Sequence, residues 1–389
     1  MSSEWRQTTI GEQVTLQRGF DITKADQRFG KIPVVSSAGI SSWHDTSMVK
    51  GPGVVLGRKG VVGSVHYIDQ DFWPHDTSLW VKNFHGNDPR FVYYFFRAFS
   101  KELQALDVGS ANPTLNRNHV HPIEVNWPAK LPEQIEIARF LGALDDRITL
   151  LRETSATLEA IAQALFKSWF VDFDPVRAKM EGRMPEGMDE ATAALFPDGF
   201  EESELGAVPR GWQPVRLDSF MELAYGKALK AEHRKPGSIP VYGSGGITGW
   251  HDAALIDRPS IIVGRKGTVG SLYWESRPFY PIDTVFYVKS QHPMTYCHQL
   301  LKTLGLHDMN TDAAVPGLNR ENVYRLLVPG AQVGVIAAFD VFAGTLRDCI
   351  DHNEAEADTL STLRDALLPR LISGQIRLPE AQAEMEATL

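Results

Sequence analysis

The sequence predicts an α+β protein in which two pseudo-symmetric domains of mixed α/β structure are held apart by a pair of long antiparallel helices in a coiled coil. Three observations lead to this prediction: an internal duplication, two helix-forming segments with a heptad spacing of apolar residues, and an acidic stretch rich in Pro and Gly between the two halves. With 389 residues the chain has room for two or three domains.

The duplication relates residues that lie 207 positions apart over roughly the first 80 residues. The stretch "VVLGRKGVVGSV" at residues 54–65 returns as "IIVGRKGTVGSL" at residues 261–272. Other matching pairs are Trp5 with Trp212, "WHD" at Trp43 with "WHD" at Trp250 and, at a shift of 203, "LNR" at Leu115 with "LNR" at Leu318. Only two copies with so long a period indicate a duplicated domain, and we expect the copies at residues 1–131 and 212–330.

Each domain is expected to combine short strands with helix. In "GPGVVLGRKGVVGSVHYID" the β-branched runs are interrupted at Gly57, Gly60 and Gly63, which predicts a strand, a tight turn and a second strand. The segment "DPRFVYYFFRAFSKELQAL", with Pro89 near its start, predicts a helix.

A long helix is predicted at residues 132–172, where the apolar residues from Ile137 to Trp169 alternate at spacings of four and three. Such a helix would be roughly 55 Å long. A weaker copy is predicted at residues 331–373, with Arg364 interrupting the seam and Ala331 standing where the first copy has Glu133. Neither helix can bury its stripe alone, so the two are expected to pack on each other, antiparallel about a pseudo-twofold axis.

The remaining segments are expected to be connections. Residues 173–211 are rich in Pro, Gly and acidic residues, which predicts a connector that crosses back along the helices. Residues 374–389 are expected to form a C-terminal tail. The two cysteines, Cys297 and Cys349, cannot form a disulfide framework or a thiolate zinc site, and both are expected to be core residues.

The net charge of −9 conceals a segregation of charge. Residues 5–122 and 212–329 each carry +3, whereas residues 123–211 carry −8 and residues 330–389 carry −6. Mildly basic repeats suit contact with a polyanion and acidic helices suit contact with something else, although acidic helices can also be simply soluble. No apolar run is long enough to span a membrane and "MSSEWRQTT" is no signal peptide, so a soluble, cytoplasmic protein is expected.

The repeated basic loop supplies the first candidate contacts with nucleic acid. The hypothesis is that its glycines let Arg and Lys project from the surface. A guanidinium can fork onto a guanine edge or a phosphate, and lysine can act as a point charge. The alternative is an ordinary exposed hairpin. The candidate residues are Arg58, Lys59 and Gly60 in the first copy and Arg265, Lys266 and Gly267 in the second.

Two further repeated motifs supply the other candidate DNA-binding residues. "WHD" follows a Ser- and Gly-rich stretch, which suits a loop that enters a groove, although Trp43 could equally be a core anchor. "LNR" supplies Asn and Arg, which are good partners for bases or phosphates. The candidates are Trp43, His44, Trp250 and His251 from the first motif and Asn116, Arg117, Asn319 and Arg320 from the second. Asp76-Thr77 and Asp283-Thr284 are expected to fix a turn.

The sequence predicts neither a catalytic residue nor a metal site. It holds no serine-hydrolase, zinc-protease or dinucleotide-binding motif. A nuclease would need clustered carboxylates beside a lysine, and the nearest candidates, Asp76 to Lys82 and Asp283 to Lys289, lack the second acid. "NWPA" at Asn126 does not supply the loop with which adenine methyltransferases grip a flipped base.

Four segments, together with the order of the parts, resemble the specificity (S) subunit of type I restriction-modification systems over nearly the whole chain. They are "LPEQIEIARFL" from Leu131, "LFKSWFVDFDPVRAK" from Leu165, "ELGAVPRGW" from Glu204 and "LLPRLISGQI" from Leu367. The resemblance implies two target-recognition domains, each reading one half of a bipartite site in double-stranded DNA. It also implies helices that set the gap between the halves and dock methyltransferase (M) subunits, two of them expected.

The resemblance implies a reader with no catalysis or cofactor of its own. The M subunits would bind S-adenosylmethionine and methylate adenine at N6, and restriction (R) subunits would add an ATP- and Mg²⁺-dependent endonuclease. The likeness of the two copies predicts related half-sites in inverted orientation. The alternatives are a coiled-coil scaffold that binds protein partners and, with less support, a metal-dependent nuclease.

Overall fold

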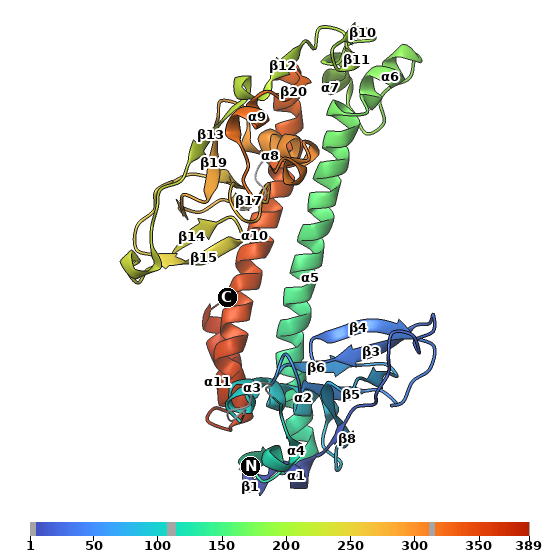
Figure 1. Cartoon of the computed structure of the whole chain (residues 1–389), viewed down its shortest axis with the longest axis vertical. Coiled ribbons are helices and arrows are strands. Elements are labelled where there is room, and N and C mark those ends of the chain that lie inside the picture. Colours follow the sequence, from blue (N-terminus) through green and yellow to red (C-terminus); the bar gives the residue numbers. More distant parts are fainter. Residues whose placement is uncertain (1–4, 107–113, 311–315, 389) are drawn as a thin grey trace. The chain divides into compact units, whose positions relative to one another are not determined.

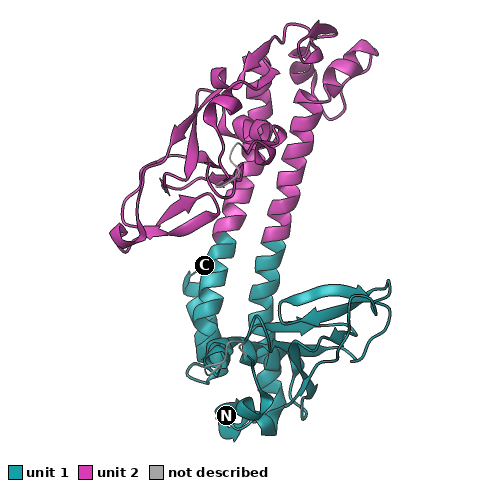
Figure 2. Ribbon diagram, viewed as in Figure 1, with its two compact units in different colours: residues 1–151, 356–389 teal, residues 152–355 magenta. Residues whose placement is uncertain are grey.

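The computed structural model describes residues 5–106, 114–310 and 316–388, and its elements are labelled in Figure 1. The chain divides into two compact units (Figure 2). Unit 1 consists of residues 1–151 and 356–389, and unit 2 of residues 152–355. Each unit therefore contains one copy of the repeat together with a part of each long helix.

The two predicted long helices are confirmed. Helix α5 spans Leu131–Phe170 and helix α10 spans Val333–Ile372, each with 40 residues. In unit 1 the buried Leu144 and Ile148 of α5 share a cluster with Leu360 of α10. In unit 2 the rings of Phe166 and Phe339 lie 5.6 Å apart, centroid to centroid. Late residues of one helix meet early residues of the other, so the helices run antiparallel within each unit.

The first repeat contains a four-stranded sheet of order β2-β8-β5-β6, a three-stranded sheet of order β4-β3-β7, and a β1-β9 pair. Its strands are β1 Trp5–Thr9, β2 Thr15–Arg18, β3 Ile32–Ser36, β4 Gly39–His44, β5 Gly53–Gly57, β6 Val65–Ile68, β7 Trp73–Pro74, β8 Ser78–Asn83 and β9 Glu124–Pro128. Its helices are α1 Ile10–Gln13, α2 Pro89–Ala98, α3 Ser100–Ala105 and α4 Arg117–Val120. The β5-β6 pair confirms the predicted strand, turn and strand.

The second repeat has the same strand orders, β13-β19-β16-β17, β15-β14-β18 and β12-β20, which confirms the duplication at the level of the fold. Its strands are β12 Pro214–Arg216, β13 Met221–Tyr225, β14 Ile239–Gly243, β15 Gly246–His251, β16 Ser260–Gly264, β17 Leu272–Glu275, β18 Tyr280–Pro281, β19 Val285–Ser290 and β20 Leu327–Pro329. Its helices are η1 Leu217–Ser219, η2 Ala231–His233, α8 Met294–Thr303, η3 Leu306–Asp308 and α9 Arg320–Tyr324.

Each repeat completes its core with residues of the long helices. In unit 1 the fully buried Phe91 of α2 and Trp127 of β9 share one cluster with Leu141 of α5 and Leu367 of α10. In unit 2 the buried Phe286 and Tyr296 share a cluster with Phe339 of α10. Because these cores are continuous, removal of either helix would expose apolar surface of the attached repeat.

The prediction that the connector crosses back along the helices is wrong. Residues 171–213 hold α6 Asp174–Met180, α7 Glu190–Ala194 and the hairpin of β10 Phe200–Ser203 with β11 Gly206–Pro209. The rings of Phe170 and Trp212 lie 5.9 Å apart, so the connector returns to the end of α5 where it began. Burial of aromatic side chains holds it there, because Phe196 packs edge-on against Trp169 at 5.2 Å.

Two smaller expectations also differ from the structure. Cys297 is buried as expected, but Cys349 is exposed, because it lies on the outer face of α10. Part of the predicted tail forms a helix, α11 Leu378–Thr388, which is anchored by the buried Ala381 and by two hydrogen bonds from Arg370 to Glu384. Of the helices in the described residues, none is both long and apolar enough to cross a membrane.

Asp145 of α5 joins three elements of unit 1. Its carboxylate accepts hydrogen bonds from Tyr94 Oη at 2.8 Å and from Arg97 Nη1 at 2.8 Å, both on α2. It also accepts one from Arg364 Nη1 of α10 at 2.6 Å. Burial and the neighbouring Asp145 carboxylate raise the pKa of Tyr94, which therefore stays a neutral donor.

We predict that Asp145→Ala lowers the free energy of unfolding of unit 1 by about 2 kcal/mol, because two guanidinium groups and a hydroxyl lose their acceptor. The matched control is Asp146→Ala, which removes an exposed ion pair with Arg90 and should cost about 0.5 kcal/mol or less. Urea unfolding measures both variants. Equal costs for the two variants would contradict the role given to Asp145.

Candidate nucleic-acid interface

The basic loop between β5 and β6 is shaped by its glycines. A Cβ atom on Gly57 would lie 1.9 Å from the carbonyl oxygen of Val61, which no side chain tolerates. Gly60 has a φ of 82°, in the left-handed region that favours glycine. The loop therefore folds back over the end of β5 and leaves Lys59 exposed, while Arg58 is half-buried.

The loop is tied to the turn that follows β7. The backbone amides of Arg58 and Lys59 both donate to the carbonyl oxygen of Thr77, at 2.9 and 3.0 Å. Arg58 Nη1 donates to the carbonyl oxygen of Asp76 at 3.3 Å. Asp76 and Thr77 thus belong to a turn, as the sequence predicted. The hydrogen bonds to this turn position Arg58.

The "LNR" segment lies against the same loop although it is far away in sequence. The amide of Leu115 donates to the carbonyl oxygen of Arg58 at 2.9 Å. The Asn116 side chain accepts from the amide of Asn118 at 3.0 Å and so caps α4. Arg117 Nη1 donates to the carbonyl oxygen of Leu16 at 3.3 Å, which holds this guanidinium near the end of β2.

These residues line one depression of about 700 Å³ on the first repeat. Of the sequence candidates, the structure brings Arg58, Asn116 and Arg117 together there. It adds Arg18 at the end of β2 and Lys82 on β8, which sequence reasoning missed. Four basic side chains around one concave surface are suited to the phosphates and base edges of a nucleic acid.

The second repeat repeats this geometry. The amides of Arg265 and Lys266 donate to the carbonyl oxygen of Thr284 at 2.9 and 3.1 Å, and Arg265 Nη1 donates to that of Asp283 at 3.0 Å. The amide of Leu318 donates to the carbonyl oxygen of Arg265 at 2.8 Å. Asn319 caps α9 by accepting from the amide of Glu321 at 2.9 Å. Gly267 has a φ of 85°, close to the 82° of Gly60 in the first copy.

Two arginines of the second repeat stack on one tyrosine. The guanidinium carbons of Arg265 and Arg320 lie 5.0 and 4.9 Å from the ring centroid of Tyr225, at the end of β13. Cation–π attraction at these distances holds both guanidinium groups at the surface. Arg265 and Arg320, two of the sequence candidates, are therefore brought together here as their counterparts are in the first repeat.

The "WHD" motif divides between surface and interior. Trp43 of β4 and Trp250 of β15 are 50% and 48% exposed, whereas His44 and His251 are buried. His44 Nδ1 accepts from the amide of Arg28 at 2.9 Å, and His251 Nδ1 accepts from that of Lys235 at 3.1 Å. The histidines thus support the local fold, and none of the four residues is among those that line the basic depression of the first repeat.

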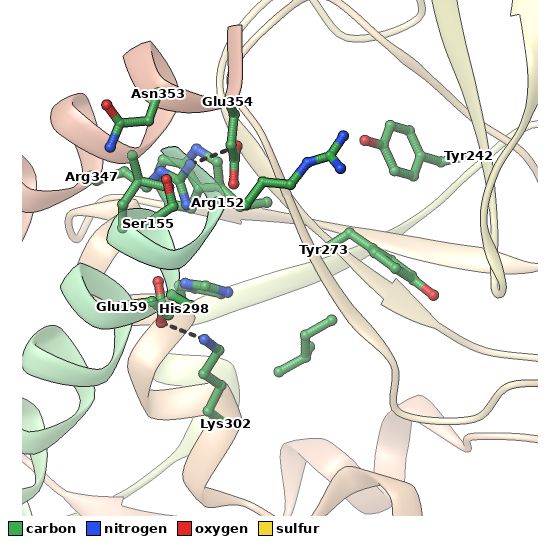
Figure 3. A pocket seen from close by; sticks show the side chains of 14 residues that line it. Arg152, Ser155, Glu159, Tyr242, Tyr273, His298, Lys302, Arg347, Asn353 and Glu354 are labelled. Carbon is green, nitrogen blue, oxygen red and sulfur yellow. Dashed lines mark hydrogen bonds and ion pairs between the residues drawn. The ribbon is translucent and has the colours of Figure 1, made fainter. Parts of the chain in front are cut away.

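A second cavity, of about 450 Å³, lies in unit 2 between α5, α10 and the second repeat (Figure 3). Its charged side chains face one another: Lys302 pairs with Glu159, and Arg347 pairs with Glu354 at 3.0 Å (Figure 3). Burial lowers the pKa of His298 to about 4, so this imidazole is neutral at pH 7. The Lys302–Glu159 pair attaches α8 of the second repeat to α5, whereas the Arg347–Glu354 pair lies within α10.

Within the described ranges, no group of three or more His, Cys, Asp or Glu residues is arranged to hold a metal ion. The depression of the first repeat instead offers guanidinium, ammonium and amide donors. Such a set can bind and orient an anionic polymer.

The model of the type I restriction modification DNA specificity domain family matches residues 2–160 and 209–319, which is more than half of the chain. The chain belongs to this family. The first matched stretch covers nearly all of the first repeat and the second covers most of the second repeat, so this is a DNA specificity protein with two recognition domains. The basic depression described above lies in the first of these two domains.

Individual relatives agree with this assignment. The chain is 36% identical over 176 residues to the type I restriction enzyme HindI specificity subunit of Haemophilus influenzae, a match covering 44% of this chain and 37% of that one. It is 26% identical over 313 residues to the MjaIX specificity subunit of Methanocaldococcus jannaschii, covering 75% and 69%. The crystal structure of the S subunit from M. genitalium shares the fold, with a TM-score of 0.62 at 19% identity over 95% of this chain.

The stability of the first recognition domain is expected to depend on pH through one histidine, His121. His121 Nε2 accepts from the amide of Leu16 at 3.0 Å, and burial, followed by the nearby Arg117, lowers the pKa of His121. The folded state therefore favours the neutral imidazole of His121. The stability that this imidazole contributes is lost as the pH falls below about 6.5, which is the pKa of histidine in the unfolded chain. In the second recognition domain the hydroxyl of Tyr324 accepts from the amide of Leu223 at 2.7 Å in its place.

We predict that His121→Tyr reduces the loss of stability between pH 7 and pH 5, because tyrosine accepts the same hydrogen bond without titrating in this range. The urea midpoint at the two pH values measures the effect. His292 of unit 2, whose pKa is also lowered by burial, is present in both proteins and cancels in the comparison. An unchanged pH dependence in the variant would argue against the role of His121.

Proposed function

We propose that this chain is the recognition subunit of a type I restriction-modification complex and reads a bipartite target, one half-site with each recognition domain. The observation that supports this proposal is the recurrence of one basic geometry in a single chain. In each copy a glycine-shaped loop carries an arginine that is tied to an Asp-Thr turn and to an "LNR" segment. Two such surfaces suit two related half-sites of one duplex.

The distribution of charge supports the same division of labour. Both repeats are basic, and four cations of the first repeat gather around its depression. The long helices and the connector are acidic, which disfavours contact with phosphates. Guanidinium and ammonium groups on the two repeats would both attract the DNA backbone and read base edges, with affinity falling as salt concentration rises.

The long helices are proposed to dock M subunits. Their buried stripe is occupied by the partner helix, yet large apolar residues remain exposed on their outer faces. Leu150 and Ile161 of α5 are 54% and 49% exposed, and Val341 and Phe342 of α10 are 69% and 43% exposed. Apolar positions on an otherwise acidic helix suit a protein partner that covers them.

On this proposal the chain itself catalyses nothing. The M subunits would bind S-adenosylmethionine and methylate adenine, and R subunits, where present, would add ATP- and Mg²⁺-dependent cleavage. The basic surfaces of the two repeats would place the target adenines by fixing the register of the complex on the duplex.

The deciding experiment is co-expression with the M subunit of the same system in a host free of adenine methylation, followed by mapping of modified adenines across the genome. The expected result is a split motif with a fixed spacer. A stable complex with an active M subunit that neither modifies nor binds DNA would instead favour a scaffold for protein partners.

We predict that Arg58→Ala weakens discrimination at only one half-site, by about 1–3 kcal/mol, because it removes a base contact from one recognition domain. Arg265→Ala should do the same at the other half-site. Binding is measured on the full target and on duplexes with either half scrambled. Lys50→Ala is the control, because Lys50 is exposed, pairs with Asp71 and does not line the depression. A uniform loss on all duplexes, with a reduced salt slope, would indicate a phosphate contact instead.

A further inference from the structure

Of the four basic residues that line the depression of the first recognition domain, three recur at the matching positions of the second domain and one does not. Arg58, Lys82 and Arg117 of the first domain recur as Arg265, Lys289 and Arg320 of the second. The position at the end of the β2 strand does not recur, because Arg18 is replaced by Tyr225 at the end of β13. Both side chains lie beside the shared cations.

Arg18 is a positioned side chain. Its Nη2 atom lies 2.7 Å from Asp21 Oδ1 and 3.2 Å from Asp76 Oδ2, and half of the side chain is exposed. The second domain keeps the counterpart of Asp76, which is Asp283, but has Ala228 where Asp21 would be. The arginine and the acid that orients it have therefore changed together.

Tyr225 is positioned by different partners. Its ring packs edge-on against Phe286 at 5.0 Å and carries Arg265 and Arg320 on its faces, at 5.0 and 4.9 Å from the centroid. The first domain has Leu79 at the position of Phe286, so the residue against which Tyr225 packs also differs between the two domains. The tyrosine nevertheless remains 48% exposed.

This coordinated change is not required by the fold. Strand pairing is the same in both domains, since β2 pairs with β8 as β13 pairs with β19. The side chains of Arg18 and Tyr225 are each about half exposed, so burial alone does not fix the residue at this position. Selection of an arginine with its own acid in one copy, and of a stacked tyrosine in the other, points to a ligand that differs between the copies.

We propose that Arg18 and Tyr225 are specificity-determining residues that make the two domains read different bases at equivalent positions of their half-sites. This inference rests on the proposed bipartite function. A guanidinium can donate two hydrogen bonds to O6 and N7 of guanine. A tyrosine has one hydroxyl and an apolar ring, which suits the methyl edge of thymine and cannot form that fork. The first domain selects guanine opposite Arg18, and the second selects a different base opposite Tyr225.

The test is the methylation motif of the complex with its M subunit, compared between the wild type and the variants Arg18→Tyr and Tyr225→Arg. Arg18→Tyr should abolish the preference for guanine at one position of one half-site, by about tenfold or more in relative methylation. Tyr225→Arg should shift one position of the other half-site toward guanine. The spacer and the remaining positions should not change.

Two variants separate recognition from folding. Arg28→Tyr makes the same substitution at an exposed arginine that is also paired with an aspartate, Asp45, but lies outside the depression, and it should leave the motif unchanged. Arg18→Lys keeps the charge without the fork and should relax the guanine preference while the complex still assembles.

The outcomes are distinct. A wild-type complex without a split motif would overturn the proposed function and this inference together. A split wild-type motif that Arg18→Tyr leaves unchanged would overturn only the inference. The same base at the equivalent position of both half-sites, or an effect of both variants on one half-site, would also overturn it.

Discussion

The two long helices each carry an apolar stripe that neither can bury alone, and the burial of these stripes against each other is the constraint on which the other contacts depend. In unit 1 the stripe of α5 packs on Leu360 and Leu367, and in unit 2 Phe166 packs on Phe339. Each repeat then builds its core onto this pair, as Trp127 does in unit 1. A recognition domain is therefore held on its helices by a shared core, and its depression has a defined orientation relative to them.

Ion pairs and hydrogen bonds supplement the apolar packing that attaches each repeat to the long helices. In unit 1 a single carboxylate, Asp145, gathers donors from α2 and α10. In unit 2 Glu159 accepts from Gln299 and Lys302 of α8, so a different acid of α5 performs the corresponding task. Both acids are less than a quarter exposed. Apolar packing is nondirectional, whereas charge-assisted hydrogen bonds of this kind fix the orientation of the groups that they join.

The sequence predicted the duplication, both helices and the strand, turn and strand of the basic loop, because these depend on periodicity and on paired motifs. It missed Arg18 and Lys82, since the pairing of β2 with β8 brings them to the depression from distant parts of the chain. It treated Trp43 and His44 as one motif, but adjacent residues of a strand point to opposite faces, so only the tryptophan is exposed. The predicted path of the connector was wrong, because amino-acid composition does not reveal which aromatic residues are buried.

The two copies also show which identities the fold requires. A backbone amide needs an acceptor, and His121 or Tyr324 serves equally. Gly57 and Gly264 cannot change, because a Cβ atom would lie 1.9 or 2.1 Å from a carbonyl oxygen. Arg58 and Arg265 fit neither case, since each guanidinium donates a hydrogen bond to one surface carbonyl oxygen, a contact worth about 1 kcal/mol, and Arg265 in addition stacks on Tyr225. The proposed function accounts for their retention in both copies, because a duplex bearing phosphates and guanine edges has the chemistry that guanidinium groups bind.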